Sequence, residues 1–176
     1  MSTDPNCEVA HGSAANAGTP DRLLVAVFAS PVADVLLRWG AELGFRTVLV
    51  EPDPDRVPAG TPDVTVRAFA ELDDELAGGS ADVVVTDHHR DELGELLRDA
   101  LGRPARWVGV MGNPRHEGPH VAALTALGVP PEEIARVHRP IGLDIGSRAP
   151  AEIAVSTLAG LLADRNGRGG GFAHGG

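Results

Sequence analysis

The sequence predicts an α/β domain in which helices cover both faces of a single, mostly parallel, doubly wound sheet. Short, continuous apolar runs alternate along the chain with segments whose apolar residues recur at helical spacing. This alternation is typical of a parallel sheet with crossover helices. The first apolar run, Leu23 to Phe28, contains no polar residue, as expected of a strand that is buried on both faces. Right-handed crossovers then make such a sheet doubly wound, which gives a Rossmann-like fold.

The expected elements follow in chain order. Strands are predicted at 23–28, 46–50, 64–67, 82–86 and 106–111, and helices at 31–43, 91–101, 116–127 and 150–164. Ser30 is the expected N-cap of the first helix, with Pro31 at its first position, and Gly44 is expected to stop that helix. The last helix is expected to face the core with Ile153, Leu158, Leu161 and Leu162.

The length of 176 residues fits one domain with short tails. Residues 1–20 lack hydrophobic periodicity and predict a disordered tail, whereas residues 21–165 carry the whole alternating pattern. Residues 166–176 are rich in glycine and predict a second flexible tail. A domain of this size buries enough apolar surface to fold without disulfides or a structural metal.

Composition excludes several classes of function. The net charge of −10 argues against a nucleic-acid partner, because phosphate binding needs concentrated positive charge. The single cysteine, Cys7, excludes an intramolecular disulfide and any all-cysteine metal site. No apolar run reaches the roughly 18 residues of a membrane-spanning helix, and the N-terminus lacks the pattern of a secretory signal. We therefore expect a soluble, cytoplasmic protein.

Ligands of doubly wound sheets bind beyond the carboxyl ends of the strands. Glu51 ends the second strand at the position of the acidic residue that accepts a ribose hydroxyl in dinucleotide-binding domains. The preceding turn, Ala29 to Asp34, nevertheless contains no glycine, and Pro31 lacks an N–H donor. We expect phosphate recognition by this turn to be weakened substantially, and the segment to act as an ordinary strand-to-helix turn.

Two further strands end in polar residues that are candidate ligand contacts. His88 and His89 follow the fourth strand and could contact a ligand, hold a metal or shuttle protons. Adjacent side chains diverge in an extended chain, so the alternative is that His89 or Asp91 caps the next helix. Asn113 and Arg115 follow the fifth strand and would suit an anionic group; ordinary surface ion pairing is the alternative for them.

Asp144 lies between Gly142 and Gly146 in an otherwise apolar segment. A carboxylate in such surroundings needs hydrogen bonds or a cation. The simplest role for Asp144 is to tie its own loop together through backbone N–H groups. A catalytic or metal-binding role, with His138 and Glu152 converging on it, is the alternative.

Three segments together resemble the C-terminal domain of the XdhC/CoxI family of molybdenum-hydroxylase maturation factors. They are Thr86-Asp87-His88-His89-Arg90-Asp91, Trp107 to Arg115, and Val137 to Gly146 with its Ile141-Gly142-Leu143-Asp144-Ile145-Gly146 core, which runs on into Pro150 to Ser156. Members of the family carry a glycine turn after the first strand, and here Ala29 and Pro31 are aligned with its first two glycines. The family's N-terminal cysteine motif has no counterpart around Cys7.

The resemblance implies an accessory factor, or chaperone, that assists the handling of molybdenum cofactor or its insertion into a xanthine-dehydrogenase-type enzyme. Its implied partners are the molybdenum hydroxylase or that enzyme's maturation proteins, and a homodimer is compatible with the sequence. The cofactor itself is not identified: molybdenum cofactor (molybdopterin) is the candidate, and NAD(P) is the alternative. Glu51, His88, His89, Asn113, Arg115 and Asp144 are the candidate cofactor-binding residues. No catalytic residue is assigned, and an accessory role is favoured over an enzyme.

Two other hypotheses remain open at this stage. One is an NAD(P)-binding oxidoreductase-like domain with a degenerate glycine loop, which the predicted fold and Glu51 suggest. The other is a small hydrolase or metal-dependent enzyme that uses His88, His89 and Asp144. The sequence lacks a Gly-x-Ser-x-Gly elbow and a Walker-type loop, so serine-hydrolase and P-loop chemistries are not indicated.

Overall fold

The structure, a computed structural model, describes residues 22–58, 64–112 and 118–170 of the chain. Six strands form one sheet in the order β3-β2-β1-β4-β5-β6, and every neighbouring pair is parallel. The strands are β1 (Leu23–Val27), β2 (Arg46–Val50), β3 (Thr65–Val66), β4 (Ala81–Val85), β5 (Trp107–Val110) and β6 (Val137–His138). This confirms the predicted doubly wound α/β fold, whose strand order reverses between β1 and β4.

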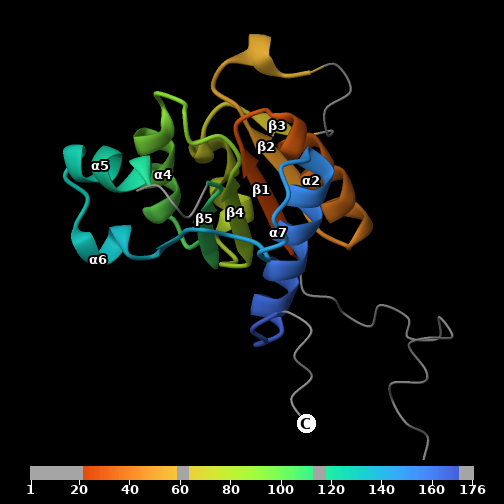
Figure 1. The fold of residues 1–176 in the computed structure, drawn as a ribbon. Helices are drawn as coiled ribbons and strands as arrows, with labels where there is room; N and C mark the ends of the chain where they lie inside the picture. Colours follow the sequence, from red (N-terminus) through yellow and green to blue (C-terminus); the bar gives the residue numbers. More distant parts are fainter. Residues whose placement is uncertain (1–21, 59–63, 113–117, 171–176) are drawn as a thin grey trace, which may run out of the picture.

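Helices cover both faces of the sheet (Figure 1). On one face, α2 (Pro31–Glu42) and α7 (Pro150–Arg165) pack over residues such as Leu24, Ala26 and Val84. On the other face lie α3 (Asp73–Leu76), α4 (Leu93–Leu101) and α5 (Pro119–Ala126), with α6 (Pro131–Ile134) beside them. Two short 3-10 helices, η1 (Pro54–Arg56) and η2 (Phe69–Leu72), complete the described elements. Each face of the sheet therefore has its own hydrophobic core.

Local sequence signals set most element boundaries. The side chain of Ser30 accepts a hydrogen bond from the backbone N–H of Ala33, and Pro31 begins α2, as predicted. Gly44, just past the end of this helix, has a φ of 84°, a conformation that glycine adopts without strain. Of the four residues predicted to face the core from α7, Leu158 and Leu161 are buried, and Ile153 and Leu162 pack against them.

The short elements escaped prediction. β6 has two residues, and α3 and α6 have four each, which is too short to show a hydrophobic period. The third strand is also shorter than expected, at Thr65–Val66. The helix predicted over 116–127 is α5, which begins at Pro119.

A buried ion pair fixes α7 to the amino-terminal edge of the sheet. Asp82 of β4 is fully buried, and its two carboxylate oxygens accept hydrogen bonds of 2.7 Å from Arg106 Nε and Arg165 Nε. Arg165 also donates to the carbonyl oxygen of Ser80 and stacks over the ring of Phe45. A buried carboxylate is tolerated only when it is paired in this way, so the end of α7 is held at a defined place. Among the described helices, none is long and apolar enough to cross a membrane.

Candidate functional site

The topology places the candidate site at the carboxyl ends of β1, β2, β4, β5 and β6. In a doubly wound sheet the ligand crevice opens where the strand order reverses, here between β1 and β4. Three loops that the sequence singled out meet at this edge: the β1–α2 turn, the segment after β2, and the β4–α4 segment. The loop after β5 reaches the same edge, but its residues Asn113 and Arg115 lie outside the described part of the chain.

The β1–α2 turn has its left-handed residue at Phe28, where φ is 73°. In the alignment above, Ala29 and Pro31 stand in place of the first two glycines. The residue of the turn that needs a left-handed conformation is therefore one position earlier than expected. Phe28 is fully buried, and a left-handed phenylalanine costs about 1–2 kcal/mol relative to glycine. Its strain is offset by contacts with two residues of the β4–α4 segment, Thr86 and Arg90.

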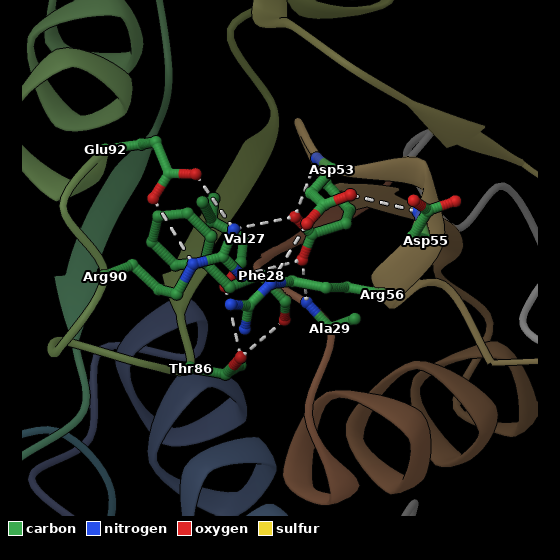
Figure 2. Close-up of polar contacts among 10 residues, drawn as sticks. Val27, Phe28, Ala29, Asp53, Asp55, Arg56, Thr86, Arg90 and Glu92 are labelled. Atoms are coloured by element: carbon green, nitrogen blue, oxygen red, sulfur yellow. Dashed lines mark hydrogen bonds and ion pairs between the residues drawn. The ribbon is translucent and has the colours of Figure 1, made fainter.

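Thr86 joins the carboxyl ends of β1 and β4. Its hydroxyl lies 2.8 Å from the carbonyl oxygen of Phe28 and 3.1 Å from that of Val27, so that it donates to this pair of acceptors. The hydroxyl of Ser30 in turn donates to Thr86 Oγ1 at 3.0 Å. The contacts of Thr86 with Val27 and Phe28 run across the switch point itself (Figure 2).

Glu51, the predicted ribose-binding residue, is held by Arg90. The guanidinium of Arg90 makes a two-pronged contact with the Glu51 carboxylate, with Nη1–Oε2 at 3.1 Å and Nη2–Oε1 at 3.0 Å. The backbone N–H groups of Ala29 and Asp53 donate to the same carboxylate at 2.8 and 3.0 Å. The side chain of Glu51 is 0% exposed and that of Arg90 is 7% exposed. Glu51 thus accepts hydrogen bonds from two backbone N–H groups and from the Arg90 guanidinium.

Arg90 is the residue of this site that sequence reasoning missed. Its guanidinium also pairs with Glu92 at 3.0 Å and lies 4.6 Å from the centre of the Phe28 ring (Figure 2). Burial opposes the charged form of Arg90, but the hydrogen bonds to Glu51 and Glu92 outweigh it and raise the pKa of Arg90. One sequence signal could have indicated Arg90. It is an arginine four residues after the predicted strand 82–86, at the same edge of the sheet as Glu51, an acidic residue with no other obvious partner.

His88 and His89 lie together rather than apart. Their ring centroids are 4.1 Å from each other, so the expectation that the two side chains diverge is wrong. The chain turns at these residues instead of continuing the strand. The capping alternative is also wrong, because α4 has Glu92 at its N-cap position with no side-chain cap bond. The carboxylate of Asp87 accepts from the backbone N–H of His89 at 2.9 Å and shapes this turn.

Arg139, just after β6, lies against the end of β5 and is close enough to His88 to influence its charge. Its guanidinium lies against Gly112 so closely that a Cβ at Gly112 would come within 2.5 Å of Arg139 Nη2. Burial and the neighbouring charges of His89 and Arg139 lower the pKa of His88, against opposing contributions from the Met111 backbone and Asp87. The edge of β4, β5 and β6 therefore carries a fixed positive charge beside a histidine that favours its neutral form.

His120 of α5 belongs to the same cluster. It is 7% exposed, and its Nδ1 has no hydrogen-bond partner among the residues that the structure describes. Its ring lies against Gly118, where a Cβ would come within 2.3 Å of Nδ1, and the aliphatic part of Arg139 borders the same glycine. Burial and then the charge of Arg139 lower the pKa of His120.

The Asp144 loop is organised by α7 and not by Asp144. Asp144 is exposed, and its carboxylate makes no hydrogen bond to another described residue, so the predicted loop-tying role is wrong. The loop is held instead by Ser156, whose hydroxyl donates to the carbonyl of Leu143 at 2.6 Å. Gly142 has a φ of 83°, and its Cα would lie 3.2 Å from a Cβ at Gly160.

The residues that were expected to converge on Asp144 have other partners. His138 stacks on Trp107 with ring centroids 5.0 Å apart, and Glu152 accepts a hydrogen bond from Ser147. Within the described part of the chain, no group of three or more His, Cys, Asp or Glu residues is placed to hold a metal ion. The structure thus joins Glu51 to Arg90 and His88 to His89, and among the described residues Asp144 makes no hydrogen bond or ion pair with either pair.

Comparisons with known proteins agree with this architecture. Residues 24–161 match the model of the XdhC Rossmann domain. The chain is 34% identical over 90 residues to the uncharacterized protein YqeB of Escherichia coli (strain K12), a match that covers 51% of this chain and 16% of YqeB. It also superposes with a TM-score of 0.65 on a crystal structure described as a xanthine dehydrogenase of Bacillus halodurans, at 24% identity, over 89% of this chain and 45% of that one. The chain thus spans less than half the length of either protein.

Proposed function

Because this chain belongs to the XdhC family through its Rossmann domain, we propose that it is an accessory factor in the maturation of a molybdenum hydroxylase. In this role it assists the handling of molybdenum cofactor, or its insertion into a xanthine-dehydrogenase-type enzyme, together with a partner protein. The observation that carries the proposal is the family match over residues 24–161, which includes the Asp144 loop and the segment with His88 and His89.

The carboxyl ends of β4, β5 and β6, with Arg139, His88 and His120, form the β4–β6 edge. Its charge favours the binding of an anionic ligand. Molybdopterin carries a phosphate, and a guanidinium is well suited to bind a phosphate through two parallel hydrogen bonds. Arg139 supplies such a group beside His88 and His120, two imidazoles whose pKa values are lowered by burial and by Arg139. An incoming phosphate would favour their protonated forms, because an opposite charge nearby stabilises the charged state. We propose His88, His89 and Arg139 as contacts of the cargo, with Asn113 and Arg115 from the adjoining loop.

The arrangement around Glu51 favours this role over dinucleotide chemistry. The carboxylate that would accept ribose hydroxyls already accepts hydrogen bonds from Ala29, Asp53 and Arg90. A buried carboxylate gives up such partners only at a cost of several kcal/mol, about 3–5. The first turn without glycine and the paired carboxylate of Glu51 thus both argue against dinucleotide binding.

The proposal is tested with molybdopterin released from a purified molybdenum hydroxylase. The chain is mixed with the cofactor under reducing, oxygen-free conditions and passed through a gel-filtration column, and pterin fluorescence is measured in the protein peak. We expect the wild-type chain to retain pterin and to increase the activation of cofactor-free hydroxylase. Arg139→Gln should retain less, whereas Arg56→Gln, a change at an exposed arginine paired with Asp53, should behave as wild type.

The contrary outcome is equally clear. If the wild-type chain neither retains pterin, nor associates with the hydroxylase, nor changes its activation, the proposed accessory role is wrong. Retention that is identical in Arg139→Gln and Arg56→Gln would keep the role and reject the β4–β6 edge as the place where the cargo is bound.

A further inference from the structure

A dinucleotide in a doubly wound sheet needs three features at the switch point. The crevice between the first strand and its reversed neighbour must be open, the first turn must present backbone N–H groups to the pyrophosphate, and the acidic residue after the second strand must face the ribose. The residues that would meet these requirements lie in β1, β2, β4 and the turns that follow them, all within the described part of the chain.

The crevice between β1 and β4 is bridged by hydroxyl groups. Thr86, the first residue after β4, reaches the carbonyl oxygens of Val27 and Phe28, and Ser30 reaches Thr86. These hydrogen bonds use side chains from both sides of the switch point. A pyrophosphate at this place would have to displace Thr86 and leave the Phe28 carbonyl, on a fully buried residue, without its donor.

Three N–H groups of the first turn, those of Ala29, Ala33 and Asp34, already donate to acceptors within the protein. The N–H of Ala29 points to Glu51 Oε2 at 2.8 Å, and that of Ala33 points to Ser30 Oγ at 3.0 Å. Pro31 has no N–H. In addition, the acidic side chain of Asp34 lies in the first turn of α2, where it repels an incoming phosphate. The turn therefore offers a pyrophosphate fewer free N–H donors than a glycine-rich turn does.

The acidic residue after β2 is held by an internal cation. Arg90 starts from the β4 side, passes over the Phe28 ring at 4.6 Å and meets Glu51 on the β2 side with two hydrogen bonds. It thereby spans the end of β1, which lies between β2 and β4. The Glu51 side chain is 0% exposed in this arrangement, so a ribose hydroxyl could reach it only after Arg90 had left.

From these three observations we infer that the chain closes its own dinucleotide crevice, with Arg90 standing as an internal ligand of Glu51 in the place of a ribose. The same contact makes Arg90 a positioning residue for the β4–α4 segment, which carries His88 and His89 two positions and one position before it. The closure goes beyond the proposed accessory role and stands independently of it, because it concerns the β1–β4 crevice. The positioning of His88 and His89 bears in addition on the contacts proposed for the cargo.

The closure is tested on the wild-type chain by calorimetric titration with NAD, NADP and ADP-ribose. We expect no saturable binding with a dissociation constant below about 1 mM, the weak end of specific binding. Saturable binding of any of the three below that value overturns the closure. This result is independent of the pterin experiment, so the two proposals can fail separately.

The positioning role is tested with Arg90→Lys, which keeps the positive charge and loses the two-pronged contact. We expect hydrogen exchange at the Ala29 and Asp53 amides to accelerate about tenfold, because the carboxylate that accepts them loses its anchor. We also expect the ring-proton NMR signals of His88 and His89 to shift. Arg56→Lys is the matched control, since Arg56 makes its exposed pair with Asp53 and not with Glu51.

Unchanged amide exchange and unchanged histidine signals in Arg90→Lys would overturn the positioning role. Equal changes in Arg56→Lys would overturn it too, because they would reflect a general loss of positive charge near η1. If Arg90→Lys does not fold, the positioning role is tested by the hydrogen exchange of the Ala29 and Asp53 amides in the wild-type chain. Both amides must be protected as strongly as those of β1, and fast exchange would contradict the anchoring of Glu51 by Arg90.

Discussion

The hydroxyl of Ser156 in α7 donates a 2.6 Å hydrogen bond to the carbonyl of Leu143, and the N–H of Leu143 donates back to the Ser156 carbonyl at 3.3 Å. This reciprocal pair attaches the Asp144 loop to a helix that is itself anchored in the core through Leu158 and Leu161. The loop that marks the family is therefore positioned from α7, thirteen residues further along the chain.

Ser156→Ala removes the donor to Leu143 and leaves a carbonyl without its partner. We expect the free energy of unfolding to fall by about 1–2 kcal/mol, and amide exchange to accelerate over residues 141–146. Thr125→Ala is the control, because Thr125 makes a similar hydroxyl-to-carbonyl bond, to Val121, at an exposed position of α5. Denaturant titration and hydrogen-exchange mass spectrometry measure both effects. Faster exchange in the control, or none in Ser156→Ala, would contradict the tether.

Gly142→Ala tests the close contact between the loop and α7. Gly142 has a φ of 83°, and a Cβ there would lie 2.6 Å from Ser156 Oγ and 3.1 Å from the Thr157 nitrogen. Gly128 also has a positive φ, of 74°, but no atom within 4 Å of its Cβ position. Gly128→Ala should therefore cost only the backbone strain of about 1–2 kcal/mol, and Gly142→Ala should cost about 1–3 kcal/mol more through overpacking. Thermal or denaturant unfolding gives the difference, and equal losses would refute the packing argument.

Asp82→Asn tests the anchor at the other end of α7. Removing the charge leaves Arg106 and Arg165 without their shared buried carboxylate, so we expect a loss of about 3–5 kcal/mol in the free energy of unfolding. Asp164→Asn is the control, because Asp164 contacts Arg106 from a side chain that is 47% exposed, and exposed pairs contribute about 1 kcal/mol or less. A loss for Asp82→Asn no larger than that of the control would show that the buried pair does not hold α7.

His120 predicts a pH dependence of stability. Burial and Arg139 lower its pKa from the ordinary 6.5, so the folded chain binds this proton less readily than the unfolded chain does. The contribution of neutral His120 to the free energy of unfolding is then fully present above pH 6.5. It is lost as the pH falls from there toward the lowered pKa. His88 contributes in the same direction, because its pKa is also lowered.

His120→Gln should weaken this pH dependence. We expect the difference in unfolding free energy between about pH 7.5 and about pH 5.5, the range in which histidines titrate, to be smaller in His120→Gln than in wild type. His138→Gln serves as the control, since His138 is exposed. Chemical denaturation at both pH values measures the difference. An unchanged difference in His120→Gln would show that His120 does not titrate differently in the folded and unfolded chains.

Much of the fold could be predicted because its signals are local. Apolar runs predicted β1, β2, β4 and β5 to within about one residue, and Ser30 with Pro31 predicted the start of α2. The two-residue β6 could not be predicted in this way, because a strand that short shows no period. Its identity as a strand comes from pairing with Val108 and Gly109 of β5.

The candidate site was predicted less well, because side-chain contacts are not local. Glu51 is a candidate ligand contact because of its place at the end of β2, but its partner Arg90 lies 39 residues away in the sequence. The two side chains meet only because β2 and β4 are the two neighbours of β1 in the sheet. His88 and His89 were placed correctly after β4, yet their rings lie together because the Asp87 carboxylate bends the chain there. The role expected of Asp144 belongs to Ser156, which reaches the loop only in the folded chain.

The alternation of strands and helices, the N-cap of α2 and the relation to the family could all be read from the chain, because each depends on residues that are neighbours in the sequence. The pairing of Arg90 with Glu51, the bridge of Thr86 between β1 and β4, and the exposure of Asp144 became known only from the folded chain. Charge pairing and burial depend on which strand ends become neighbours, and the strand order β3-β2-β1-β4-β5-β6 is fixed by the packing of the whole sheet.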